Sequence, residues 1–268
     1  MIIDFHTHAF PDNLAERAIG GIVRSTRDVY EIERPVYCTG RTDDLKRQMR
    51  KNGIDMSVVL PIATKVGQYH SINDYAEKIT GGELISFASL HPYDENVEDI
   101  VKDIAKRGFK GIKLHPEYQG FYVDDDRAIK LVKTACENGL YTLFHAGEDL
   151  GVPAPFHSSP DRFLKLFKQA DESMIILAHM GGFRQWDEVE EKLVGTKAYF
   201  DTAVVSKFMN IDLYKRIIDK HGADRILFGS DDPWENPLET LEFLKISDVD
   251  KEQFELITYK NAKKLLNL

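Results

Sequence analysis

Two histidines stand two residues apart at the end of the first apolar run, in the stretch DFHTH at residues 4–8. Successive side chains of a strand point to opposite faces, so a strand here places Asp4, His6 and His8 on one face and the residues between them on the other. A carboxylate and two imidazoles fill a core poorly, whereas both are ligands that zinc takes in proteins. The pattern therefore predicts half of a metal site, whose remaining ligands come from elsewhere in the chain.

Histidines also stand at the ends of other apolar runs. Aspartates end two late runs, at Asp201 and at Asp231 with Asp232. A lone histidine beside a strand is usually a structural residue whose nitrogens are hydrogen-bonded. Here, however, six of the nine histidines lie at the end of an apolar run. If the strands are parallel, these side chains converge on one edge of the sheet. The six are His6, His8, His91, His115, His145 and His179.

Eight apolar, β-branched runs alternate with amphipathic segments. Such alternation predicts a parallel sheet with crossover helices, and a (β/α)₈ barrel typically takes about 250 residues. An open doubly wound sheet is the alternative, but no glycine-rich nucleotide motif follows any run. We therefore predict an α/β fold, a single TIM-barrel domain over residues 1–268. The runs are 1–8, 55–61, 84–92, 109–116, 140–147, 174–182, 197–203 and 225–232, with helical segments at 43–53, 71–82, 95–108, 125–139, 159–170, 183–195 and 209–222.

Two stretches depart from this alternation. Residues 20–42 lack a clear period, and we predict a long loop there, after the first strand and a short helix. Residues 237–268 are predicted to form two extra helices that close the domain.

Composition limits the function classes. The net charge of −9 disfavours a nucleic-acid binder, and no apolar run reaches the roughly 20 residues of a membrane helix. The two cysteines, Cys38 and Cys136, suit a reducing compartment, and the N-terminus lacks a signal-peptide pattern. We therefore expect a cytoplasmic protein whose partner is a small-molecule substrate, with no nucleic acid and no membrane.

His6, His8, His145 and Asp231 together have the residue types of a catalytic metal shell. In a closed barrel the last strand lies beside the first, which brings Asp231 next to His6 and His8. Catalytic zinc keeps an open position for water beside its protein ligands. We predict one divalent ion, Zn²⁺ in the first place, with Mn²⁺ or Fe²⁺ as alternatives because imidazole and carboxylate suit all three.

The ordered motifs DFHTH, FHAG, LAHMGG and FGSDDPW, with the closing NAKKLL, resemble the amidohydrolase superfamily. The most similar branch is the amidohydrolase-related one, which includes aminocarboxymuconate semialdehyde decarboxylase and related carboxy-lyases and hydrolases. The resemblance implies a distorted (β/α)₈ barrel with a divalent metal, most often zinc, in its mouth. It implies His6, His8, His145 and Asp231 as metal ligands. Asp231 and His179 are then catalytic, Asp231 taking the proton of the bound water and His179 acting as proton shuttle or substrate contact.

Three further residues are predicted to bind substrate: Lys113, His115 and Arg184. Binuclear members of the superfamily carry a carboxylated lysine on the fourth strand, so a bridging carbamate on Lys113 and a second metal are one alternative. A buried structural lysine is another. His115 is either a substrate contact or a strand-end cap. Arg184 follows HMGGF directly and has the bidentate donors that bind a carboxylate.

Two reactions fit these residues. We favour a hydrolase that uses a metal-activated water on an ester, a lactone or an amide. The alternative is a non-oxidative decarboxylase or hydratase acting on an unsaturated or aromatic carboxylic acid. A barrel without catalysis is disfavoured because every expected ligand type is present. Homo-oligomers are usual among similar proteins, so assembly of several copies is a further expectation.

Overall fold

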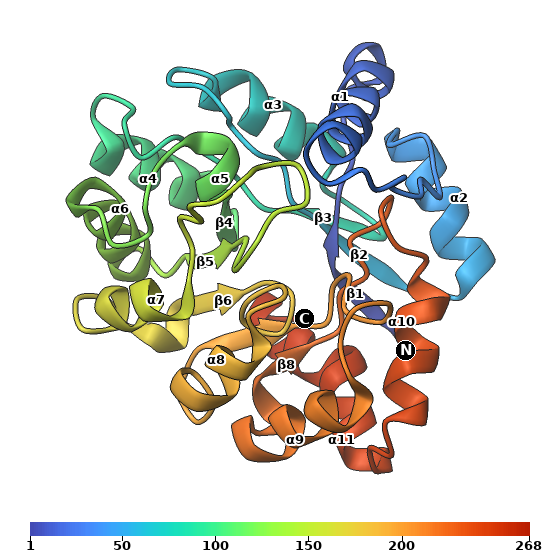
Figure 1. Ribbon diagram of the computed structural model, residues 1–268. Helices are drawn as coiled ribbons and strands as arrows, with labels where there is room; N and C mark the ends of the chain where they lie inside the picture. Colours follow the sequence, from blue (N-terminus) through green and yellow to red (C-terminus); the bar gives the residue numbers. More distant parts are fainter.

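Eight parallel strands form the centre of the computed structural model, which describes residues 1–268, and helices surround them (Figure 1). Each strand lies within one of the eight runs that the sequence predicts as strands. They are β1 (Ile3–Thr7), β2 (Met56–Val59), β3 (Leu84–Ser86), β4 (Gly111–Leu114), β5 (Tyr141–Phe144), β6 (Ile175–Leu177), β7 (Tyr199–Asp201) and β8 (Ile226–Leu227).

The strands close into a barrel. They pair in the orders β1-β2-β3 and β4-β5-β6-β7-β8, and one bridge joins the chain after β3 to β4. A second bridge joins Thr7 of β1 to Asp232 after β8. Beside it the N–H of Asp231 donates to the carbonyl of His6, and the N–H of His8 donates to that of Asp232, both at 2.7 Å. These contacts, called here the β8–β1 seam, confirm the predicted barrel.

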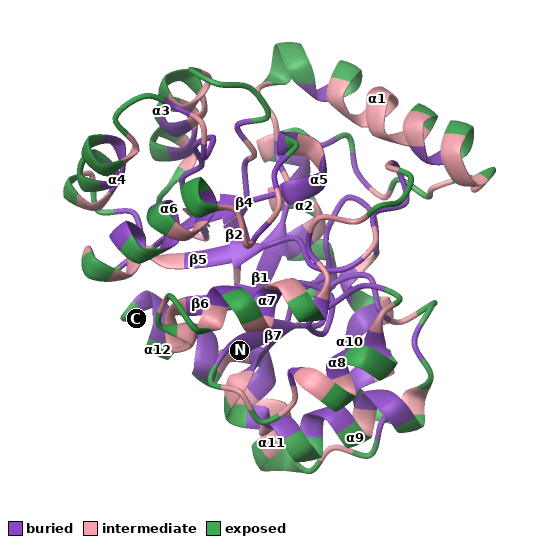
Figure 2. Cartoon of the chain, turned by 60° about the vertical axis from the view of Figure 1, so that its left-hand side comes forward, coloured by how far each residue is buried: buried purple, intermediate pink, exposed green.

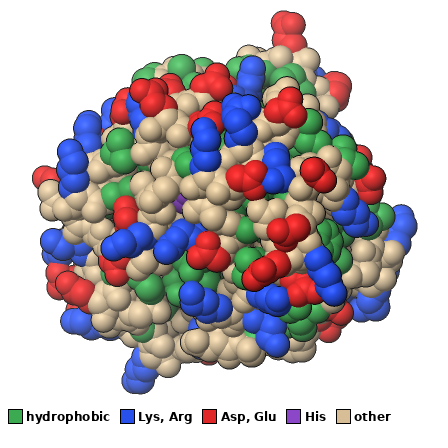
Figure 3. Space-filling view, turned by 90° about the horizontal axis from the view of Figure 1, so that it is seen from below, with side chains coloured by type: hydrophobic (Ala, Val, Ile, Leu, Met, Phe, Trp, Pro, Cys, Tyr) green, Lys and Arg blue, Asp and Glu red, His purple; other side chains and the backbone are tan.

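Helices cover the outside of the barrel, with buried inner faces and exposed outer faces (Figure 2). Figure 3 shows one outer face, where acidic and basic side chains are interspersed with apolar ones. None of the helices has the length and apolarity that crossing a bilayer requires. They are α1 (Asp12–Tyr30), α2 (Thr42–Asn52), α3 (Tyr69–Ile79), α4 (Val97–Lys106), α5 (Pro116–Gln119), α6 (Asp126–Glu137), α7 (Pro160–Phe167), α8 (Trp186–Lys192), α9 (Ile211–His221), α10 (Pro237–Ile246), α11 (Lys251–Glu255) and α12 (Asn261–Leu266).

The interior of the barrel is apolar below the strand ends. Phe5, Leu143 and Ile176, from strands on different sides of the barrel, belong to one cluster of buried side chains. Leu265 and Leu266 of α12 belong to the same cluster, so the closing helices seal the N-terminal end of the barrel. The C-terminal strand ends are left to form a site, as in other barrels of this class.

A one-residue register shift in β1 changes the predicted arrangement of its side chains. Asp4 pairs with Ser57 and Thr7 pairs with Val59, so three steps along β1 match two along β2. This bulge places Asp4 on the side of Thr7. The prediction that Asp4 shares a face with the two histidines is therefore wrong, and Asp4 does not line the cavity described below.

The predicted loop after the first strand is also partly wrong, because α1 continues to Tyr30 through Gly20 and Gly21. Ile19 and Ile22 recur at helical spacing and pack against the core. This burial offsets the roughly 1 kcal/mol that each glycine costs in a helix interior. The remaining loop covers residues 31–41.

Replacing Gly21 by alanine is expected to stabilise the protein by about 0.5–1 kcal/mol, because alanine favours a helix interior. No atom lies within 4 Å of the added Cβ. The matched control is Gly53→Ala, which also meets open space but has a φ of +70° and is therefore expected to destabilise. Urea unfolding measures both free energies, and a destabilised Gly21→Ala protein would contradict the helical assignment.

His221 at the end of α9 makes stability sensitive to acid. Its Nε2–H donates to the carbonyl of Ala198 at 2.9 Å, and its Nδ1 accepts from the N–H of Gly195 at 3.2 Å. Burial lowers the pKa of His221 to about 4. In the unfolded chain this imidazole has its ordinary pKa of about 6.5, so its full contribution to the free energy of unfolding is present above that pH. It falls between pH 6.5 and 4, by at most about 1.4 kcal/mol per pH unit.

The variant His221→Gln keeps one donor and one acceptor without a titrating group. We expect its unfolding free energy to fall less steeply than that of the wild type between pH 7 and 5, measured by urea unfolding. Equal slopes for the two proteins would contradict the burial of a neutral imidazole.

Candidate metal centre and substrate cavity

A cavity of about 350 Å³ lies at the C-terminal ends of the strands. The structure brings seven of the eight predicted site residues into its lining and leaves out Arg184. The seven come from β1, from the ends of β4, β5 and β6, and from the chain after β8. They are His6, His8, Lys113, His115, His145, His179 and Asp231.

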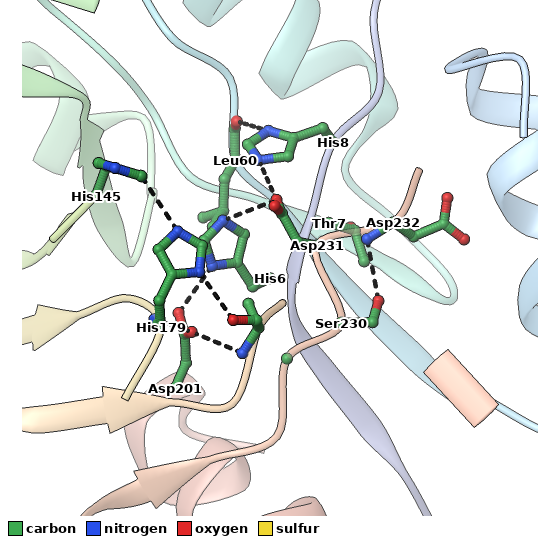
Figure 4. Close-up of polar contacts among 12 residues, drawn as sticks. His6, Thr7, His8, Leu60, His145, His179, Asp201, Ser230, Asp231 and Asp232 are labelled. Carbon is green, nitrogen blue, oxygen red and sulfur yellow. Dashed lines mark hydrogen bonds and ion pairs between the residues drawn. The ribbon is translucent and has the colours of Figure 1, made fainter. Parts of the chain in front are cut away.

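The two β1 histidines are anchored through their outer nitrogens (Figure 4). His6 Nδ1 lies 2.8 Å from a carboxylate oxygen of Asp201, and His8 Nδ1 lies 2.8 Å from the carbonyl oxygen of Leu60. Because both partners are acceptors, each Nδ1 carries the proton. The Nε2 atoms of His6 and His8 face Asp231 Oδ1 at 3.4 and 2.9 Å. An imidazole lone pair and a carboxylate oxygen attract one another only through a cation, either a proton or a metal ion.

The histidines after β5 and β6 repeat this arrangement. His145 Nε2 lies 3.0 Å from the carbonyl oxygen of Glu148, and His179 Nδ1 lies 2.9 Å from that of Ala203. The free nitrogens, His145 Nδ1 and His179 Nε2, face one another at 3.1 Å (Figure 4). Burial lowers the pKa of His145 to about 3 and that of His179 to about 4, so both rings are neutral at pH 7. Two lone pairs at this distance repel one another unless a cation, a proton or a metal ion, lies between them.

The donor set fits a divalent metal ion. The ligand atoms of His6, His8 and Asp231 all lie within 4.8 Å of one another. Histidines that bind metals usually donate their second N–H to a carboxylate or a carbonyl, which fixes ring orientation and tautomer, and all four histidines here do so. Of the four predicted ligands, His145 lies outside this group and belongs to a second one with His115 and Asp149, whose ligand atoms also lie within 4.8 Å of one another.

Asp231 occupies a strained position at the centre of the site. Its φ of +67° lies in the left-handed region, as does that of His179 at +59°, and such strain in non-glycine residues gathers at functional sites. Burial alone would raise the pKa of Asp231, but His6 and His8 hold it well below the usual range for a carboxyl group. The side chain is therefore an ionised, buried acceptor.

Lys113 points into the same space from β4. It is only 1% exposed, and its Nζ lies 3.5 Å from His6 Nε2, with no carboxylate within 4.0 Å. Burial lowers its pKa to about 8, although Asp201 and Asp231 oppose the shift. The three explanations offered by the sequence stay open, and substrate binding by Lys113 stays a prediction.

His115 lies at the end of β4, and its predicted contact with substrate stays a prediction. Its ring stacks between those of Tyr118 and His145, with centroids 3.9 and 4.1 Å away. It lines the cavity and also caps α5, since its Nδ1 accepts from the N–H of Tyr118 at 3.4 Å. On the other side its Nε2 lies 3.5 Å from Asp149 Oδ2. Asp149 has no signal in the sequence, because it lies in a loop without periodicity.

The arginines that line the cavity, Arg17 and Arg34, differ from the one expected. Arg184 is 43% exposed and pairs with Glu148 at 3.4 Å. Arg34, from the loop at residues 31–41, lines the cavity instead, with its Nη2 3.5 Å from Asp231 Oδ2. Arg34 could not be predicted from the sequence because an irregular loop has no period that assigns its side chains to a face.

A family model described as amidohydrolase matches residues 3–268. This match confirms the resemblance drawn from the sequence motifs. Among curated proteins, none matches the chain by sequence.

Solved structures share the fold at low sequence identity. A 5-carboxyvanillate decarboxylase from Novosphingobium aromaticivorans, with bound manganese, has 15% identity and a TM-score of 0.73 over 100% of this chain and 97% of its own. A dihydroxybenzoic acid decarboxylase from Polaromonas sp. JS666, also with manganese, has 16% identity and a TM-score of 0.68, over 100% of this chain and 97% of its own. A candidate 2-pyrone-4,6-dicarboxylic acid hydrolase from Pseudomonas putida has 16% identity and a TM-score of 0.68, over 99% of this chain and 97% of its own.

The contact between His6 and Asp201 is expected to tune metal affinity. Replacing Asp201 by asparagine removes the charge that holds the His6 ring and its tautomer, and such changes typically cost about 10- to 100-fold in affinity. Titration of Zn²⁺ and Mn²⁺ into metal-free protein, followed by calorimetry, measures the effect. Asp187→Asn, on the exposed side of α8, is the matched control and should bind as the wild type does. Unchanged affinity in Asp201→Asn would contradict the role of this contact.

Proposed function

Because the chain belongs to the amidohydrolase family, we propose that it is a metal-dependent hydrolase of a small ester, lactone or amide. One observation carries the proposal. Four buried imidazoles have their outer nitrogens anchored to acceptors, and their inner nitrogens face one cavity that also contains the Asp231 carboxylate. This arrangement supports a metal site with room beside it for a substrate.

The proposed ion is Zn²⁺, held by His6, His8 and Asp231, with His145 as a further ligand. Manganese in two structural neighbours supports Mn²⁺ as an alternative, beside Fe²⁺. When bound, such an ion lowers the pKa of water to about 7 and polarises a substrate carbonyl.

The remaining steps use side chains of the chain itself. Asp231 directs Oδ1 to His8, while Oδ2 is directed toward Arg34 and is free to accept the proton of the attacking water. His179 takes up at Nε2 the proton that Asp231 accepted and passes it to the leaving group, because Nδ1 is already engaged by the carbonyl of Ala203. The contact of Nδ1 with Ala203 also leaves His179 Nε2 facing the cavity, 3.1 Å from His145 Nδ1.

Decarboxylation is the second candidate. It requires an anchored carboxylate, and the cavity lining contains three cationic side chains, those of Arg17, Arg34 and Lys113. Two of the structural neighbours are decarboxylases of aromatic acids, which adds support. The two reactions differ in their product, since only decarboxylation releases CO₂.

Other expectations remain proposals. We propose one catalytic domain over residues 1–268, which acts on a small molecule in the cytoplasm. The two cysteines, which are unpaired, support a reducing location. Assembly into homo-oligomers stays a prediction, which light scattering tests.

Substrate screening with Asp231→Asn tests the function. Esters, lactones, amides and carboxylic acids are offered to the metal-loaded protein, while acid release and CO₂ release are recorded separately. We expect hydrolysis that a chelator abolishes and that Asp231→Asn slows by about 10²- to 10⁴-fold, the usual contribution of general base catalysis. Asp187→Asn serves again as control. CO₂ release without hydrolysis would replace the first candidate by the second.

A further inference from the structure

We infer that the substrate carries an alkyl chain of several carbon atoms beside the carbonyl group that reacts. This chain occupies the part of the cavity that is lined by α1, by α3 and by the residues before them, called here the apolar lobe. The inference rests on the proposed function and deepens it, because it names the class of ester, lactone or amide that the site accepts. The walls of the apolar lobe include Phe10, Leu14, Ala18, Ile22, Ile62 and Ile72.

The lining of the cavity is divided into a polar part and an apolar part. Two segments, residues 9–22 and 60–75, supply the apolar lobe, whereas the histidines and the carboxylates of the lining come from other parts of the chain. The only charged lining residue of these two segments is Arg17, whose side chain is exposed. A ligand that extends from the metal-binding residues into the lobe therefore meets an almost uncharged surface.

One side of α1 forms the first wall of the apolar lobe. Leu14, Ala18 and Ile22 recur every four residues, which places them in one stripe along the helix, and all three line the cavity. The adjacent stripe contains Ile19 and Val23, which pack against the core. Leu14 is 44% exposed, so the stripe that faces the cavity is incompletely covered by the rest of the chain.

The second wall comes from the chain after β2 and from α3, and both are fixed to Ser89. Ala63, which follows Ile62, donates its N–H to Ser89 Oγ at 2.9 Å. Asn73, which follows Ile72, accepts the N–H of Ser89 at Oδ1, at 2.8 Å. Because the backbone is held beside both isoleucines, less ordering entropy is lost when a ligand binds between the walls.

A hydrocarbon chain is the ligand that fits this lobe. Partly exposed apolar side chains are stabilised when apolar surface covers them, and an alkyl chain brings no polar group that would be left without a partner there. The lobe and the metal-binding residues line one cavity of about 350 Å³, a size typical of small-molecule sites. One molecule can therefore place its carbonyl beside Asp231 and its chain beside α1.

Binding of the linear amides butanamide, hexanamide and octanamide tests the inference. These probes are neutral and differ only in chain length, and calorimetry on metal-free and metal-loaded protein measures their affinities. We expect the affinity of the wild type to rise by about two- to fourfold for each added methylene in both forms, because each methylene leaves water for the lobe.

Two substitutions on α1 change the lobe. Ala18→Leu fills it with a residue that favours a helix, so the gain per methylene should disappear. Leu14→Gln makes an exposed part of the wall polar and should reduce the gain, and it keeps the test decisive if Ala18→Leu fails to fold. Leu238→Gln is the matched control, because Leu238 of α10 is 47% exposed and lies outside the lining; it should bind the series as the wild type does.

The inference is overturned if the affinity of the wild type does not rise with chain length. It is also overturned if a folded variant of Ala18 or Leu14 keeps the full wild-type gain per methylene. These results leave the metal-dependent reaction untouched. In contrast, a metal-loaded protein that binds the longer amides through the lobe but hydrolyses no ester, lactone or amide would overturn the proposed function alone.

Discussion

The β8–β1 seam is the contact on which the site depends. The N–H of Asp231 donates to the carbonyl of His6 and that of His8 to Asp232, and both bonds are short at 2.7 Å. They close the barrel and bring a carboxylate from the end of the chain against two imidazoles from its beginning. Asp4 strengthens the seam, because its carboxylate accepts the N–H of Ser230 at 3.0 Å. Without this closure the inner nitrogens of His6 and His8 would not face the Asp231 carboxylate.

The same closure produces a conflict between burial and charge. His6, His145 and His179 are almost fully buried, and burial lowers the pKa of each, so the rings are neutral. Their outer nitrogens satisfy acceptors, which leaves lone pairs directed at one another and at Asp231. Buried polar groups without partners are costly, and a divalent cation provides one partner for all of them. The arrangement is thus stable as a ligand shell.

The parts of the fold that follow from local sequence were predictable. The eight runs became strands because β-branched residues and alternating polarity act over short distances. Five of the six strand-end histidines line one cavity because parallel strands end at one edge, whereas His91 contacts the carbonyl of Gln119 instead. The bulge that turns Asp4 away from His6 was not predictable, since it depends on pairing with β2. The lack of a clear period after residue 20 predicted a loop, and the packing of Ile19 and Ile22 stabilises a helix there through Gly20 and Gly21. Arg34 escaped notice because its place depends on Trp234 and on the contacts of nearby Tyr37 with Pro233 and Glu239, and these three partners are distant in sequence.

Anomalous diffraction from crystals grown with Mn²⁺ or Zn²⁺, recorded at the absorption edge of the metal, tests the central claim most directly. The account predicts a peak about 2.0–2.2 Å from Nε2 of His6, from Nε2 of His8 and from a carboxylate oxygen of Asp231. A cavity without any anomalous peak, or a metal bound only by residues outside this shell, would contradict it.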